Sequence, residues 1–113
     1  MEIKSHEAGD IIVMELEGRF DAYSAPKANE WLEEVMTNRR PPNVIVNLEH
    51  VVFVDSTALA TLVQAMKRCR QLDGNLCLSN LKQPVRMIFE LTRLDRAFEI
   101  FNLEEEAIGA FAN

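Results

Sequence analysis

The sequence predicts an α/β fold in which a mixed β-sheet of four to five strands is flanked by about four helices. Short apolar runs typical of strands alternate with segments whose apolar residues recur at helical spacing. Strands separated by helices run parallel, because each helix carries the chain back along the sheet. Only a turn separates the first two strand-like runs, which indicates one antiparallel pair at an edge. The 113 residues suit one core, so we treat 1–113 as one domain.

The first part of the chain predicts two strands followed by a helix. The strand-like runs cover residues 3–6 and 11–16. Ser24 is suited to cap the helix that follows, and Pro26 is tolerated in its first turn because a proline there loses no hydrogen bond. The pair at residues 41–42 is Pro-Pro, which a helix does not pass through, so we expect the helix to end before it.

The middle of the chain contains an abrupt corner, Asp55-Ser56-Thr57. We expect His50 in an exposed loop, followed by an apolar run over residues 51–54 that leads into the corner. A helix with one apolar stripe begins at once and covers residues 59–72. Gly74 follows that stripe and is suited to the left-handed conformation that terminates many helices.

The last part of the chain predicts two strands and two helices. A strand over residues 76–78 precedes a helix over 84–91, and a final strand lies near 98–101. Asn102 and Glu105 have the spacing of a capping box that opens a C-terminal helix. We expect these bulky apolar side chains in the core: Trp31, Met66, Met87, Phe89, Phe98 and Phe101.

Composition excludes several classes of function. The net charge of −6 and the pI of about 4.9 disfavour non-specific binding to nucleic acid or to an anionic membrane. No apolar run approaches the roughly 20 residues of a membrane span, and no signal peptide is visible, so we expect a cytoplasmic protein. Cys69 and Cys77 fall on apolar patterns without metal-ligand spacing, so we expect two buried reduced thiols, no metal and no cofactor.

Four interpretations of the Asp55-Ser56-Thr57 corner are open: a helix cap, a catalytic serine, a phosphoacceptor aspartate and a phosphoacceptor serine. As a cap, Asp55 or Ser56 satisfies the first N–H groups of the helix. A serine hydrolase needs a glycine-flanked nucleophile and a base, and no glycine flanks Ser56. A phosphoacceptor aspartate needs further acids to hold Mg²⁺, and only Asp21 is expected to approach Asp55. Both enzyme interpretations are therefore disfavoured.

Ser56 as a phosphoacceptor is the interpretation that stays open beside the helix cap. A phosphate placed there meets free N–H groups and the favourable end of the helix dipole. It adds a charge of about −1.5 to −2 beside Asp55, which the fold tolerates but a docked partner does not. The expected result is a switch of binding rather than of folding.

Three motifs, taken together, resemble the STAS family and specifically its bacterial anti-sigma factor antagonists. The first is Gly18-Arg19-Phe20-Asp21, and the second is VNLEHVVFVDSTAL, which starts at Val46. The third is PVRMIFELTRLDRAFEIF, which starts at Pro84. The second motif is the most specific of the three, and all of them occur in the order that the family shows.

This resemblance implies a protein without catalytic activity that acts by partner switching. Ser56 is the implied phosphoacceptor, with Thr57 as a secondary candidate, and its kinase is the anti-sigma factor, an ATP-binding serine kinase. The unphosphorylated antagonist binds that kinase, and a serine phosphatase resets the switch. Asp55 is expected to shape the loop and contact the partner, beside Asp21 in the neighbouring loop. Tyr23, if exposed beside Asp21, adds to the same surface.

One departure from the family pattern concerns the residues after the corner. Many members have glycine where this chain has Ala58 and Ala60, and alanine lacks the backbone freedom of glycine. This departure keeps a second interpretation open, in which the domain is a constitutive interaction subunit of a transporter-associated or signalling assembly. In that case Ser56 is only a helix cap and is not phosphorylated. The sequence makes no prediction of the oligomeric state.

Overall fold

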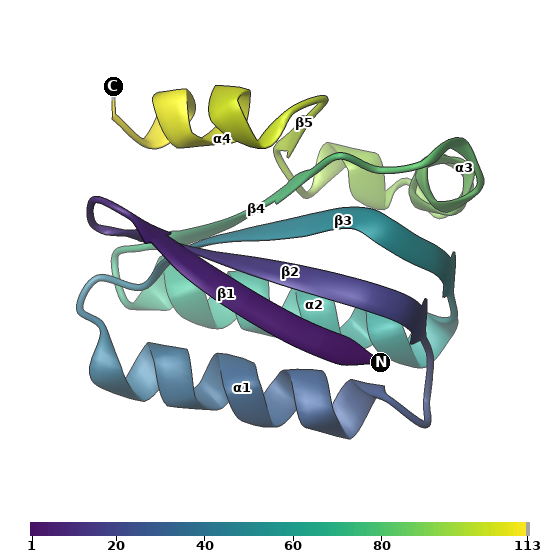
Figure 1. Ribbon diagram of the computed structural model, residues 1–113, viewed down its shortest axis with the longest axis horizontal. Helices are drawn as coiled ribbons and strands as arrows, with labels where there is room; N and C mark the ends of the chain where they lie inside the picture. Colours follow the sequence, from purple (N-terminus) through teal and green to yellow (C-terminus); the bar gives the residue numbers. More distant parts are fainter. Residues whose placement is uncertain (113) are drawn as a thin grey trace.

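A computed structural model describes residues 1–112 as a five-stranded sheet with α1 and α2 on one face and α3 and α4 on the other (Figure 1). The elements are β1 (Glu2–Ala8), β2 (Ile11–Phe20), α1 (Ala25–Asn38), β3 (Asn43–Val54), α2 (Ser56–Gln71), β4 (Asn75–Ser79), α3 (Gln83–Leu91), the short 3₁₀ helix η1 (Leu94–Arg96), β5 (Ile100–Phe101) and α4 (Glu104–Phe111). This order confirms the predicted α/β fold.

The strands lie in the order in which they occur in the chain, from β1 to β5. β1 pairs with β2 antiparallel, as predicted, and every later neighbour pairs parallel. At the end of β2, Phe20 lies opposite Val54 of β3. The loops that follow these two strands therefore leave the sheet side by side, at the edge where parallel α/β sheets carry their sites.

The main core lies between the sheet and the pair α1 and α2. Leu16, Leu32 and Leu62 illustrate it, since each is fully buried and comes from a different element. A smaller cluster on the opposite face joins Val13 and Ile45 of the sheet to Ala107 of α4. Side chains of adjacent strand positions alternate between these two clusters, as the pleat requires.

Three of the expected core side chains are not fully buried, and one of them is Phe101, which is half-buried. Met87 is 48% exposed, so its assignment to the core is wrong, and Trp31 is only half-buried. The reason at Met87 is geometric: α3 has nine residues and buries only Val85 and Phe89 against the rest of the protein. Phe89 packs edge-on against Phe98, with ring centroids 5.8 Å apart, and Met66 is buried as predicted.

His50, expected in a loop, instead lies within one continuous strand that also includes residues 51–54. β3 continues for 12 residues, and His50 lies within it with its side chain exposed. The pairing with β2 shifts in register between Glu15 and Glu17, and again after Gly18, which indicates bulges. These bulges let β2 and β3 stay paired as far as the corner.

The termination of α2 also differs from the prediction. Asp73, with φ of 67°, takes the left-handed conformation in place of Gly74. Gly74 is required for a different reason, because a Cβ atom there would lie 2.0 Å from the Pro42 carbonyl oxygen. The backbone of β4 enters the sheet in contact with the segment that precedes β3, and only glycine leaves room for that approach.

α4 begins one residue later than expected and is tied to the sheet by its first residue. The Leu103 N–H donates to Glu106 Oε1 at 3.0 Å, which replaces the predicted capping pair. Glu104 Oε1 accepts a hydrogen bond from Asn47 Nδ2, and Glu104 Oε2 lies 2.9 Å from His6 Nε2. One carboxylate thus joins α4 to both β3 and β1.

Candidate functional site

The candidate site is formed where the β2–α1 and β3–α2 loops meet. The Asp55 N–H donates to the Phe20 carbonyl oxygen at 3.2 Å, which continues the sheet pairing by one residue. The Asp55 carboxylate then reaches across to the other loop, where Oδ2 accepts a hydrogen bond from the Ala22 N–H at 2.8 Å. The corner that the sequence singled out is therefore joined to the Asp21 loop by a side chain.

Asp55 is also the residue that caps α2. Its Oδ1 accepts from the Ala58 N–H at 2.9 Å, and its backbone is extended at the N-cap position. Of the two caps that the sequence left open, Asp55 takes the role and Ser56 does not. Both carboxylate oxygens of Asp55 are occupied by backbone N–H groups, so the residue holds the geometry of the loop.

Asp21 has a corresponding role at the start of α1. Its Oδ1 accepts from the N–H groups of Tyr23 and Ser24, each at 3.1 Å. The Ser24 N–H, followed by the Ser24 hydroxyl, the Tyr23 N–H and Arg19, holds the pKa of the Asp21 carboxyl below its usual value, against an opposing effect of desolvation. The carboxylate is therefore ionised at neutral pH.

Ser24 does not cap α1 through its side chain, which corrects the prediction. Its Oγ donates to the Arg19 carbonyl oxygen at 2.9 Å and accepts from the Asp21 N–H at 3.0 Å. The sequence pattern indicated a cap at Ser24, whereas Asp21, three residues earlier, accepts the hydrogen bonds of this turn.

Ser56 and Thr57 occupy the first two positions of α2 and are both exposed. The Ser56 hydroxyl makes no hydrogen bond with any residue among 1–112, unlike the oxygens of Asp55 and Asp21. Thr57 differs, since it lines a shallow depression between α1 and α2. That depression, which the sequence did not indicate, is lined by Ala22, Ala25, Pro26, Asn29, Thr57, Thr61 and Gln64.

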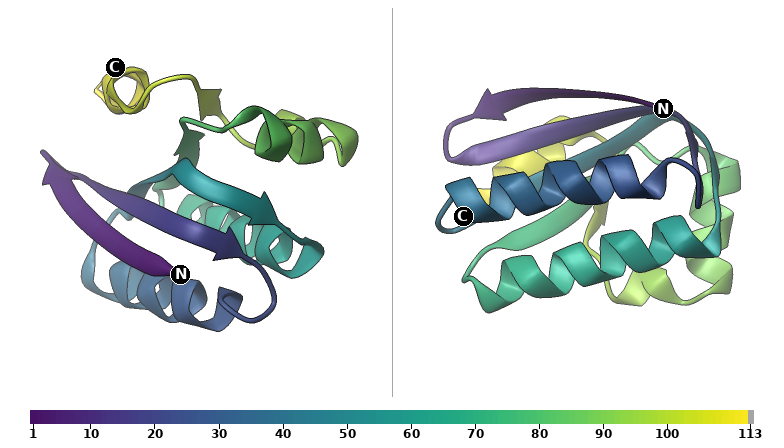
Figure 2. Two further views of the ribbon diagram at one scale, coloured as in Figure 1. Left: turned by 45° about the vertical axis from the view of Figure 1, so that its right-hand side comes forward. Right: turned by 90° about the horizontal axis from the view of Figure 1, so that it is seen from below.

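Tyr23 lies in the β2–α1 loop with 94% of its surface exposed. The N–H groups of Ala22 and Tyr23 bind the carboxylates of Asp55 and Asp21. Hydrogen bonds therefore hold this loop in place while the large amphipathic ring of Tyr23 extends into solvent. Figure 2 shows α3 at the same end of the molecule as this loop. Leu91 of α3 is 80% exposed, so a second apolar residue is available at that end, and the helical pattern alone had not indicated its exposure.

The groups needed for catalysis by Ser56 are engaged elsewhere. His6 lies beside Glu104, and His50 lies 3.8 Å from Glu49. In the part of the chain that the structure describes, no three His, Cys, Asp or Glu side chains gather as a metal site. No helix of residues 1–112 has the length and apolarity to cross a membrane.

Cys69 and Cys77 are free thiols and both are buried, as predicted. Burial is the main cause that raises the pKa of Cys69 to about 11 and that of Cys77 to about 12. Neither thiol is ionised at neutral pH, so neither is an activated nucleophile.

Comparison with known proteins gives a consistent family. The family model described as the STAS domain matches residues 2–107. The anti-sigma-B factor antagonist of Listeria monocytogenes is 36% identical over 109 residues, which cover 96% of this chain and 94% of the relative.

Solved structures share the fold at low sequence identity. An anti-sigma-factor antagonist (STAS) domain protein from Planctomyces limnophilus superposes with a TM-score of 0.89 at 20% identity and covers 98% of each chain. The Bacillus cell fate determinant SpoIIAA in its phosphorylated form superposes with a TM-score of 0.74 at 19% identity, over 97% of this chain and 99% of that one.

Proposed function

This chain belongs to the STAS domain family, and from that premise we propose that it is an anti-sigma factor antagonist that acts by partner switching. The curated relative that matches nearly end to end carries this name. In the proposal, the unphosphorylated chain binds an anti-sigma factor that is an ATP-binding serine kinase. Phosphorylation of Ser56 releases the kinase, and a serine phosphatase resets the switch. The chain itself is a substrate and binding partner, not an enzyme.

The observation that carries the proposal is the contrast between Ser56 and its neighbour. Asp55 uses both carboxylate oxygens to bind backbone N–H groups, whereas the Ser56 hydroxyl is exposed and has no partner within residues 1–112. A kinase can therefore modify Ser56 without breaking the cap of α2. If Ser56 were only a cap, as in the constitutive-subunit alternative, its hydroxyl would hold an N–H group, and Asp55 has that role instead.

A phosphate on Ser56 would be stabilised locally and unfavourable to a docked partner. The helix dipole of α2 favours negative charge at that end. The added charge of about −1.5 to −2 would nevertheless stand beside Asp55 on a protein that is already acidic. The fold would persist, and a partner surface matched to the neutral hydroxyl would be lost. SpoIIAA, which shares the fold, is known in phosphorylated and unphosphorylated forms.

The partner surface that we propose consists of Ser56 and Thr57 with Asp21, Asp55 and Tyr23. Thr57 is a secondary acceptor, since its side chain lines the depression between the two helices. Ala58, which departs from the family pattern, is buried, and its backbone is not in the left-handed region. Glycine is therefore not needed at this position for α2 to begin.

The test is to map phosphate on protein isolated from its native cell and to measure binding of the kinase recovered with it. We expect one phosphate, on Ser56, and at least a tenfold loss of kinase binding in Ser56→Asp with unchanged circular dichroism. Ser56→Ala, the matched control, should bind the kinase and resist phosphorylation. Normal binding by Ser56→Asp would contradict the proposal. Recovery of a transporter ATPase without a kinase would favour the constitutive subunit.

A further inference from the structure

The outer edge of β1 forms a second interaction surface, through which we propose that two copies of this chain pair as antiparallel strands. This inference is independent of the proposed function and concerns the opposite side of the β1–β2 hairpin from β3. It follows from three features: an open strand edge, a hollow beside it, and charges that match when the surface meets itself.

The first feature is the edge itself. β1 has seven residues, pairs with β2 without a register shift and contains no proline. It is the terminal strand of the sheet formed by residues 1–112, so its outer backbone N–H and C=O groups face no other strand. In the right-hand view of Figure 2, β1 lies along the margin of the molecule, outside α1. A regular exposed edge of this kind is a template for another strand.

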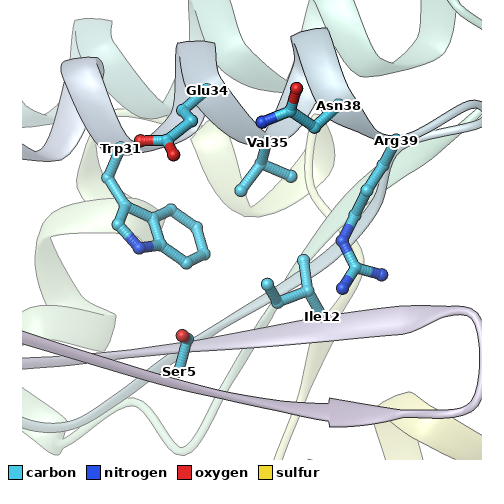
Figure 3. A pocket seen from close by; sticks show the side chains of 7 residues that line it. All are labelled: Ser5, Ile12, Trp31, Glu34, Val35, Asn38 and Arg39. Carbon is cyan, nitrogen blue, oxygen red and sulfur yellow. The ribbon is translucent and has the colours of Figure 1, made fainter.

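The second feature is the hollow between the β1–β2 hairpin and α1. Figure 3 shows Trp31 of α1 and Arg39, directly after α1, extending toward Ser5 and Ile12 of the hairpin. The indole is only half-buried, although it is the largest apolar group on this side. The hollow continues along α1 past Ile3, where Ile3 and Trp31 are flanked by the charged side chains of Lys27, Glu30 and Glu34.

α1 runs alongside β1 in the same direction, which sets the level of each side chain. Lys27 Nζ donates to the Met1 carbonyl oxygen at 3.1 Å. One turn later Trp31 lines the hollow with Ile3, and Glu34 lines it with Ser5. A positive charge therefore stands at the level of Met1 and a negative charge at the level of Ser5. Between them, Ile3 and Trp31 lie beside the Glu30 carboxylate.

The third feature is that the charges along this surface are complementary to those of the same surface on a second copy of the chain. A two-fold axis through Ile3 places Ile3 opposite Ile3 of the second copy. It also places Glu2 of each copy opposite Lys4 of the other, so this ion pair occurs twice. On the helix side the same axis brings Lys27 to the level of Glu34 of the second copy. Opposite charges thus meet on both faces of the joined sheet, with Ile3 and Trp31 at the centre.

Other registers are less favourable. Alternate side chains of β1 face opposite sides, so only shifts of two residues keep the faces of both sheets aligned. An axis through Lys4 would place Lys4 opposite itself. An axis through Ser5 would place Ile3 opposite Glu7 and Lys4 opposite His6. Charge therefore selects the axis at Ile3. Because the two β1 strands run antiparallel, the Ser56 edges of the copies point to opposite ends of the dimer and stay accessible.

The test is sedimentation equilibrium of the whole chain at low salt, over a range of concentrations. We expect a reversible dimer in the unmodified protein. Glu2→Lys and Lys4→Glu should each raise the dimer dissociation constant by tenfold or more, since like charges then meet across the interface. The double variant, in which the two charges are exchanged, should restore it. Glu105→Lys on α4, which changes the net charge as Glu2→Lys does, should leave it unchanged.

A protein that is monomeric up to about 1 mM would overturn the proposal, because no useful affinity would remain. Normal dimerisation of the single variants would also overturn the proposal. A folded double variant that does not dimerise would do the same. Lys4 also faces Glu15 in its own hairpin, so circular dichroism must show that Lys4→Glu is folded. If it is not, Glu2→Lys, which faces Glu17, decides the question alone. Unchanged phosphorylation of Ser56 in these variants would leave the proposed function standing.

Discussion

Asp21 and Asp55 bind backbone N–H groups at one sheet edge, whereas the hydroxyl of Ser56 has no hydrogen-bond partner within residues 1–112. Asp55 joins the β3–α2 corner to Ala22 and caps α2 through Ala58. Asp21 orders the turn before α1 through Tyr23 and its neighbour. Replacing an N-cap acid by alanine costs about 1 kcal/mol in typical helices. Asp55 therefore contributes to the stability of α2 as its cap, and Ser56 does not. The site therefore combines a hydrogen-bonded frame with an exposed serine hydroxyl.

The stability that Asp21 contributes should depend on pH in a definite direction. Its folded pKa is lowered from 3.8, so the unfolded chain binds more protons than the native protein at acid pH. The contribution is complete above the unfolded value and is lost as the pH falls through the lower folded value. Urea unfolding of the unmodified protein and of Asp21→Asn should differ most at neutral pH and converge below 3.8. A difference that does not change with pH would contradict this.

At the scale of elements, the close approach of two backbone segments restricts which residue a position can hold, and helix or strand propensity does not predict this restriction. The end of α2 and the start of β4 pass against Pro42, which leaves no space for a Cβ atom on Gly74. α4 is joined to the sheet by the Glu104 carboxylate, which contacts both Asn47 and His6, and by the burial of Ala107 against the sheet. These contacts fix where β4 and α4 join the sheet, and hence the order of the last two strands.

Gly74→Ala should destabilise the protein by about 2 kcal/mol or more, because the Pro42 carbonyl or the strand must move. The measurement is the urea midpoint at constant m-value. Gly109→Ala is the matched control, since a Cβ atom there meets nothing within 4 Å and the position is helical. That control should stabilise by about 0.5–1 kcal/mol. Equal effects of the two changes would refute the steric explanation.

At the scale of the whole molecule, the two thiols report on global unfolding. Cys69 lies on α2 and Cys77 on β4, and burial raises the pKa of each far above neutral. A thiol reagent at about pH 8 should therefore label the native protein far more slowly than a free peptide thiol, and both sites at a similar rate. In urea, labelling should be fast. Rapid labelling of one thiol in the native protein would show that its element opens on its own.

The whole molecule also separates its two surfaces. The Ser56 edge lies at the carboxyl ends of β2 and β3, whereas the proposed dimer surface is the outer side of β1. A dimer formed through β1 leaves both copies free to exchange partners. The proposed switch at Ser56 and the proposed self-association through β1 can therefore be tested independently in one set of variants.

The sequence by itself determined the element order, the antiparallel edge and the Asp55-Ser56-Thr57 corner, because apolar periodicity and turn residues are local signals. Only the tertiary structure decided which residue caps α2, that Asp55 binds the loop of Asp21, and that Met87 is exposed. Only the tertiary structure also showed that Asp73, and not Gly74, adopts the left-handed conformation after α2, and that Gly74 is required because it lies against Pro42. Each of these depends on how close two segments distant in sequence approach, and no local pattern encodes that distance.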